Sequence, residues 1–199
     1  MVSFFSRLRT YLKVAQTLPL LRRYVVLGMF DGIIVTLSLI ATADIGKLAT
    51  GALWTAAIGS LVGIATASAW NTIQAELLER AAELRKIERT LLRSLKGTVL
   101  ERAHKISMLL CALVHAVSPL TGLLLVILYL HLKSYSITSP YALPITTVVA
   151  GSVLGVLGIM YLGELEKSDV AKLSLLMSSA TIGVVIILLL VMKVHELGT

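Results

Sequence analysis

The chain has 199 residues, of which 57% are hydrophobic, and its mean hydropathy is +0.90. A soluble domain of this length could not bury so much apolar side chain, because its surface must stay wetted. The net charge of +7 does not indicate a nucleic-acid partner, because the basic residues flank apolar runs. Composition therefore predicts an all-α integral membrane protein, with residues 1–199 in one domain embedded in a lipid bilayer.

The first 20 residues predict a short amphipathic helix at the membrane surface. Phe4, Leu8 and Leu12 share one helical face, whereas Arg7 and Arg9 fall largely elsewhere. Basic amphipathic helices of this kind lie in the plane of the interface. A signal peptide is not indicated, because no uninterrupted apolar run follows the charges.

Five apolar segments follow, and each reaches the roughly 20 residues needed to cross a hydrocarbon core of about 30 Å. The predicted transmembrane helices cover residues 24–43, 48–73, 106–132, 141–162 and 170–194. Between the second and the third, residues 74–105 are charged and are predicted to form a cytoplasmic helical segment. The sequence leaves open whether this segment continues the second span or bends back.

The basic residues predict the orientation. With five spans, fifteen of the eighteen Lys and Arg residues fall on one side of the membrane. Cytoplasmic loops carry such an excess of Lys and Arg. We therefore expect a multi-pass protein of the cell membrane with its N-terminus in the cytoplasm and its C-terminus outside.

Three of the spans carry glycines four residues apart, a spacing that lets helix backbones approach closely within or between subunits. The pairs are Gly28 and Gly32, Gly59 and Gly63, and Gly151 and Gly155.

Asp31 is the leading candidate for a functional residue. It lies eight residues past Arg23, which places it about 12 Å into the membrane at 1.5 Å per residue, close to the midplane. Burying it there costs at least about 2.5–3.5 kcal/mol, so an ionisable residue at this depth is by default a functional candidate. It could bind a cation, take a proton, or form a hydrogen bond across a helix interface.

Milder polar groups complete a candidate transport path. Gly32 and Thr36 follow Asp31 in the first span, and Ser68 and Asn71 lie in the cytoplasmic half of the second. The amide oxygen of Asn71 could ligate a metal or bond another helix. His115 in the third span could be a ligand or proton relay, or a neutral histidine with one hydrogen bond.

Glu76, Glu79 and Glu83 are spaced by three and four residues, so they form one stripe on a helix. Hard divalent cations prefer carboxylate oxygens, which makes this stripe, together with Asp31, a candidate metal site. The alternative is a solvated helix with internal ion pairs, such as Glu79 with Arg80.

Nothing in the sequence indicates an enzyme or a bound cofactor. There is no nucleotide-binding loop, no nucleophile elbow and no His-x-x-x-His pair. Cys111 is the only cysteine, so no cluster has the spacing of structural zinc.

The first span, Arg22-Arg-Tyr-Val-Val-Leu-Gly-Met-Phe-Asp-Gly, resembles the opening helix of the vacuolar iron transporter family, which carries an Asp-Gly pair there. Five spans, a charged helical insertion after the second and a Ser-Pro pair in the third, here Ser118-Pro119, are also similar. The resemblance implies a dimeric exporter of ferrous iron or manganese that exchanges the metal for protons. It places Asp31 in the ion path and implies that Glu76, Glu79 and Glu83 bind incoming metal.

Two functions therefore stay open. The first is proton-coupled export of a divalent metal ion from the cytoplasm by a homodimer. The second is a membrane scaffold or assembly subunit that does not transport and binds partners or anionic lipid. The few acidic groups along the expected path favour the second function.

Overall fold

In a computed structural model, the described residues are 17–161, together with Tyr11, Ala15 and scattered positions between 171 and 190. This part of the chain is helical and contains no strand. Four helical stretches are long and apolar enough to cross a membrane: Thr17–Ile45, Thr50–Leu91, Val99–Ser134 and Ser139–Ile159. The prediction of an all-α chain compatible with membrane embedding is thus confirmed for four of the five expected spans.

The remaining predicted elements fall mostly beyond the described residues. Residues 171–190 include scattered helical positions, but the expected fifth span, 170–194, lies largely outside the part that the structure describes. The same is true of the amphipathic segment over residues 1–20, of which Tyr11, Ala15 and 17–20 are described.

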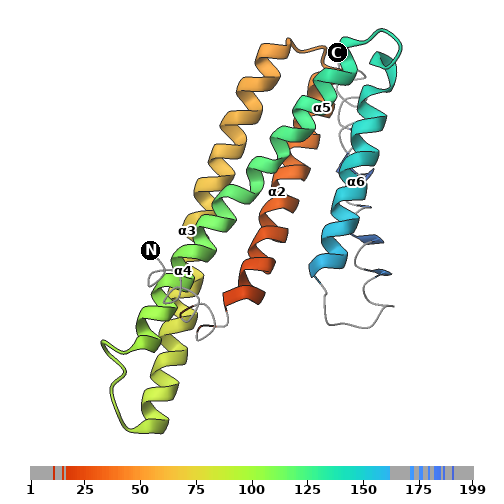
Figure 1. Cartoon of the computed structure of the whole chain (residues 1–199). Helices are drawn as coiled ribbons and strands as arrows, with labels where there is room; N and C mark the ends of the chain where they lie inside the picture. Colours follow the sequence, from red (N-terminus) through yellow and green to blue (C-terminus); the bar gives the residue numbers. More distant parts are fainter. Residues whose placement is uncertain are drawn as a thin grey trace, which may run out of the picture.

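Helix α2, Thr17–Ile45, contains the first span, and α3, Thr50–Leu91, begins after a turn of four residues in which Lys47 has a positive φ of 50°. Helix α3 is one uninterrupted helix of 42 residues. At 1.5 Å per residue it is about 63 Å long, twice the thickness of a hydrocarbon core. Residues 74–91 of the charged segment therefore continue the second span, which resolves the alternative that the sequence left open (Figure 1).

The chain reverses over residues 92–98 and returns along α3 as α4, Val99–Val117. Leu92, in the left-handed conformation, ends α3. Thr98 caps α4 by accepting a hydrogen bond from the Glu101 backbone N–H, and the Glu101 carboxylate accepts one from Gly97, 2.6 Å away. This Thr-x-x-Glu arrangement closely matches a capping box and fixes the start of the returning helix. We call the polar part of this helical pair, residues 74–105, the α3–α4 hairpin.

A break in the third span follows α4. The 3₁₀ helix η1, Ser118–Thr121, separates α4 from α5, Gly122–Ser134. Pro119 has no backbone N–H and cannot continue the α-helical ladder, which explains the break. Helix α5 leads through η2, Ser139–Tyr141, into α6, Ala142–Tyr161.

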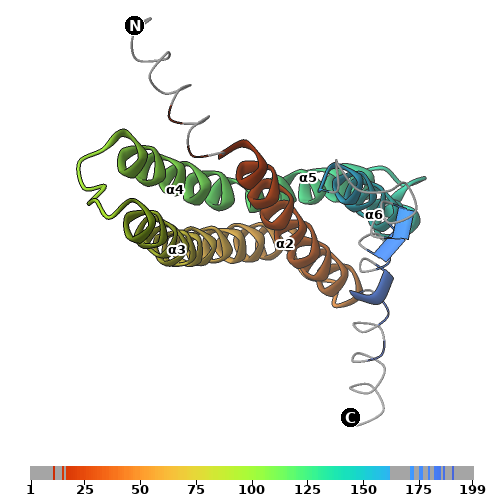
Figure 2. The ribbon, with the colours of Figure 1, turned by 90° about the horizontal axis from the view of Figure 1, so that it is seen from below.

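Helix α2 is central to the bundle and crosses the chain at this break. Figure 2 shows α3 and α4 on one side of α2, and α5 and α6 on the other. A Cβ added to Gly32 would lie 2.2 Å from the carbonyl oxygen of Pro119, and one added to Gly28 would lie 2.7 Å from Cβ of Ser118. The predicted close approach at Gly28 and Gly32 is therefore confirmed, and η1 is its partner.

The other two glycine pairs behave differently. Gly59 and Gly63 have no atom within 4 Å of an added Cβ, so they lie on an open face of α3 in this chain. Gly151 and Gly155 are buried. The apolar core lies between α2, α5 and α6, and includes Leu37, Val126 and Leu154.

Candidate functional site

Asp31 lies on an exposed face of α2, in the apolar part of the helix. Arg23 and Leu27 precede it at four-residue spacing and are also exposed. Its carboxylate has no hydrogen bond or ion pair with any residue that the structure describes, although it interacts electrostatically with His115. Asp31 is therefore available to a cation, a proton or a second molecule.

His115, on α4, is anchored at one ring nitrogen. Its Nδ1 is 2.7 Å from the Thr72 hydroxyl of α3, and its ring lies 5.2 Å from the ring of Tyr24. Its Nε2 is buried and has no hydrogen-bond partner among the described residues. Gly28 makes room for the imidazole, since a Cβ there would lie 3.0 Å from Cδ2. The ring thus has a fixed orientation and one uncommitted nitrogen.

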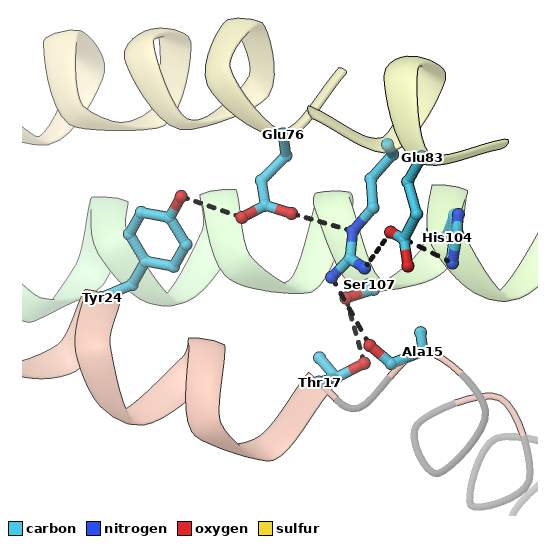
Figure 3. Close-up of polar contacts among 8 residues, drawn as sticks. Ala15, Thr17, Tyr24, Glu76, Glu83, His104 and Ser107 are labelled. Carbon is cyan, nitrogen blue, oxygen red and sulfur yellow. Dashed lines mark hydrogen bonds and ion pairs between the residues drawn. The ribbon is translucent and has the colours of Figure 1, made fainter. Parts of the chain in front are cut away.

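A buried ionic cluster lies next along the bundle, towards the α3–α4 hairpin (Figure 3). Glu76 is only 1% exposed, and both of its carboxylate oxygens have a partner. The Tyr24 hydroxyl donates to Oε1 at 3.0 Å, and Arg80 Nε donates to Oε2 at 3.2 Å. A buried carboxylate requires such partners, because an unpaired one would cost several kcal/mol.

Arg80 is the centre of this cluster. Its Nη1 donates to Glu83 at 3.1 Å, and its Nη2 donates to the carbonyl oxygen of Ala15 at 3.4 Å. His104 Nε2 lies 4.0 Å from the same Glu83 oxygen. The guanidinium therefore joins α3 to the chain that leads into α2, and Glu83 extends the cluster to His104 of α4 (Figure 3).

His104 lies between Arg102 and Lys105 in the charged segment, before the third predicted span over residues 106–132. Burial, followed by the positive charge of Arg80, lowers the pKa of His104 below its usual range. Glu83 and Glu76 oppose this shift. Its Nδ1 has no partner among the described residues, so the ring is best accommodated in the neutral form.

Together these interactions relate a series of polar side chains that begins in the apolar part of α2 and ends in the hairpin. Successive members are joined by a hydrogen bond, an ion pair, a ring contact or an electrostatic interaction. In order they are Asp31, His115, Tyr24, Glu76, Arg80, Glu83 and His104. Polar series of this kind in membrane proteins mark ion or proton pathways or interhelical contacts.

The other residues predicted for the path lie in different surroundings. Gly32 packs against Pro119, and Thr36 is buried against Gly122 with a hydroxyl that has no partner in the described part of the chain. Ser68 is 6% exposed, whereas Asn71 is exposed on α3.

The glutamate stripe does not form a metal-binding site with free carboxylates in the described part of the chain. Arg80 pairs with Glu76 and Glu83, in place of the Glu79 partner suggested by the sequence, and Glu79 is exposed. Within the described residues no three His, Cys, Asp or Glu side chains gather in a way that could hold a metal ion. Any metal bound at Asp31 or at the stripe would therefore need ligands from elsewhere or a rearranged Arg80.

Sequence reasoning missed Tyr24 and the central position of Arg80. The four-residue spacing from Glu76 to Arg80 is the signal that could have indicated the ion pair. Nothing in the sequence indicated that Tyr24, 52 positions earlier, would reach Glu76.

Comparisons with family models, curated proteins and solved structures found no match. Functional assignment therefore rests on the residues and geometry described above.

Proposed function

We propose that the chain exports a divalent metal ion, ferrous iron or manganese, from the cytoplasm in exchange for protons. Asp31 is the observation that carries this proposal. A carboxylate without a described partner, on an exposed face of a 29-residue apolar helix, is costly unless it binds something. A transported cation and a proton are the two species that a carboxylate accepts.

In this proposal a second copy of the chain covers Asp31. A carboxylate on the outer face of a single chain would otherwise contact lipid, and polar residues within membranes almost always face a bundle interior or a water-filled cavity. Gly59 and Gly63 leave α3 free for close contact with another helix. A homodimer would bring two Asp31 carboxylates towards one path and supply the ligands that one chain lacks.

Coupling to protons follows from competition at Asp31. The carboxylate can hold a metal ion or a proton, but not both, so a proton that arrives from outside displaces the metal. His115 interacts electrostatically with Asp31 and has a free Nε2, so in this proposal it acts as a second proton acceptor or metal ligand.

The glutamates of the hairpin act at the cytoplasmic mouth in this proposal. Glu79 and the half-exposed Glu83 attract divalent cations to the surface, whereas Glu76 is held by Arg80 and Tyr24. The N-terminus is cytoplasmic, in accordance with the excess of Lys and Arg on that side.

A scaffold or assembly subunit is the second candidate. It is favoured by Arg80, which pairs with two of the three candidate metal-binding glutamates, and by the long hairpin with its basic residues. In this reading Asp31 bonds to a partner helix rather than to a transported ion.

Metal flux into proteoliposomes distinguishes the two functions. Purified protein is reconstituted, a pH gradient is imposed, and ferrous-iron and manganese flux is measured for wild type and Asp31→Asn. Thr147→Ala is the matched control, because its hydroxyl bonds only Leu143 of its own helix. Gradient-dependent flux that Asp31→Asn alone abolishes supports transport. No flux above empty vesicles, from protein shown to be helical and inserted, supports the scaffold.

A further inference from the structure

An apolar groove of about 520 Å³ lies between α2 and α6. Val25 and Met29 line it from α2, and Val153 and Val156 line it from α6. The hydroxyl of Ser152, which also faces the groove, donates to the Val148 carbonyl of its own helix at 2.8 Å. The walls therefore offer hydrocarbon contact, and the groove falls within the range of about 300–1,000 Å³ that is typical of ligand sites.

One charged side chain, that of Arg22, lies on this groove. Helices α2 and α6 run in opposite directions, so the beginning of α2 and the end of α6 lie at the same end of the bundle (Figure 1). Arg22 and Leu157 therefore mark this end of the groove, and Met29 lies about 10 Å deeper along α2. This is the end at which the sequence concentrates its basic residues.

The guanidinium of Arg22 is available to a ligand. The side chain is exposed and makes no ion pair within the part of the chain that the structure describes. Guanidinium groups bind phosphate through two parallel hydrogen bonds, and basic pockets between transmembrane helices recognise anionic headgroups.

We propose that this groove binds one anionic phospholipid, with an acyl chain along Val25, Met29, Val153 and Val156 and the phosphate on Arg22. The combination of a hydrocarbon wall and a single cation at its interfacial end is complementary to this class of molecule. The proposal rests on membrane embedding and does not depend on transport.

Ala15, the described residue nearest to the start of α2, does not line the groove. The carbonyl oxygen of Ala15 accepts a hydrogen bond from Arg80 on α3. Helix α3 lies on the opposite side of α2 from α6 (Figure 2), so Ala15 lies on the side of α2 away from the groove. A neutral lipid without a phosphate group, such as a diacylglycerol, would fill the apolar walls but would leave Arg22 without a counter-ion.

Native mass spectrometry of the detergent-solubilised full chain tests the proposal. Phosphatidylglycerol and diacylglycerol with identical acyl chains are added in turn, and retention is compared for wild type, Arg22→Gln and Arg23→Gln. Arg23 is the matched control, because it is an exposed neighbouring arginine that does not line the groove. Loss of one charge-assisted contact predicts that phosphatidylglycerol retention falls about tenfold in Arg22→Gln and is nearly unchanged in Arg23→Gln.

A fourth protein, Val156→Trp, tests the apolar part of the site. Val156 is 55% exposed, so the larger ring fits without disturbing the core and fills the groove. We expect it to reduce retention of both lipids, and we expect inorganic phosphate not to displace phosphatidylglycerol. Equal retention of the two lipids by wild type, equal losses in the two arginine variants, or undiminished binding in Val156→Trp would overturn the proposal.

Discussion

The crossing of α2 over the 3₁₀ break yields the sharpest stability prediction. In Gly32→Ala the added methyl group would lie 2.2 Å from the oxygen, 2.6 Å from Cα and 2.7 Å from the carbonyl carbon of Pro119. All three atoms belong to the backbone, so no side-chain rotation relieves the clash. Helix α2 must instead move away from η1, and the neighbouring contact of Gly122 with Thr36 must open with it.

The magnitude follows from two opposing effects. Overpacking a well-fitted contact costs about 1–3 kcal/mol, and a clash with rigid backbone belongs at the upper end of that range. Alanine recovers up to about 1 kcal/mol of helix propensity relative to glycine. We therefore expect Gly32→Ala to lower the free energy of unfolding by about 2 kcal/mol.

Gly59→Ala is the matched control, because nothing lies within 4 Å of its added Cβ. It should leave stability unchanged or raise it by up to about 1 kcal/mol. Thermal unfolding in detergent, followed by circular dichroism, should separate the two variants by about 5 °C or more for a chain of this length. A Gly32→Ala protein that melts at or above the wild-type temperature would refute the close crossing of α2 and η1.

Four further measurements address the polar groups. Glu76→Ala should lower the free energy of unfolding by about 2–3 kcal/mol, because it leaves buried partners unpaired. Exposed Glu79→Ala, the control, should change it by less than about 0.5 kcal/mol. Chemical denaturation measures both, and equal midpoints for the two variants would contradict this prediction. Because the folded-state pKa of His104 lies below its unfolded value of about 6.5, wild type should lose stability as pH falls through that value and level off below the folded pKa. Melting curves of His104→Gln should lack this part of the pH dependence, and an identical slope in both proteins would exclude His104 as its source. Thr36→Val should be neutral or stabilising in the same melting assay, since it removes a buried hydroxyl without a described partner; a clear loss of stability would reveal an unseen partner. Tyr129→Phe removes a 2.6 Å hydrogen bond to the Asp44 carboxylate at the far end of α2. It should lower the free energy of unfolding by about 1–3 kcal/mol, and an unchanged melting temperature would show that this bond contributes little.

Several features of the fold were predictable because they depend on local sequence. Apolar length located the four described spans, and the spacing of Gly28 and Gly32 indicated a close helix contact. The third span was predicted as one helix, and Pro119 is the sequence signal that could have indicated its break. In each case a short stretch of chain determines the local structure. The length of an apolar run determines a span, the missing side chain of glycine allows a close helix contact, and the missing N–H group of proline breaks a helix.

The candidate site was less predictable, because it depends on contacts distant in the sequence. The stripe from Glu76 to Glu83 was correctly expected on one helix, but burial of Glu76 depends on Tyr24, which a different helix supplies. Helical spacing allows Arg80 to pair with a carboxylate one turn before or one turn after it, and the position of α4 decides which carboxylates are nearby. Exposure of Asp31 likewise depends on how α2 is rotated in the bundle, which periodicity alone left undetermined because apolar residues surround it.

The unbroken course of α3 also has a mechanical consequence. From residue 74 to Leu91 the helix extends about 26 Å beyond the apolar part, without glycine, proline or another hinge. A tilt of the apolar half by about 5° would displace the far end by about 2 Å, so the helix acts as a lever arm. A spectroscopic label at the hairpin tip would therefore report a tilt of α3 inside the bilayer. A molecule bound to the tip would restrain the same motion.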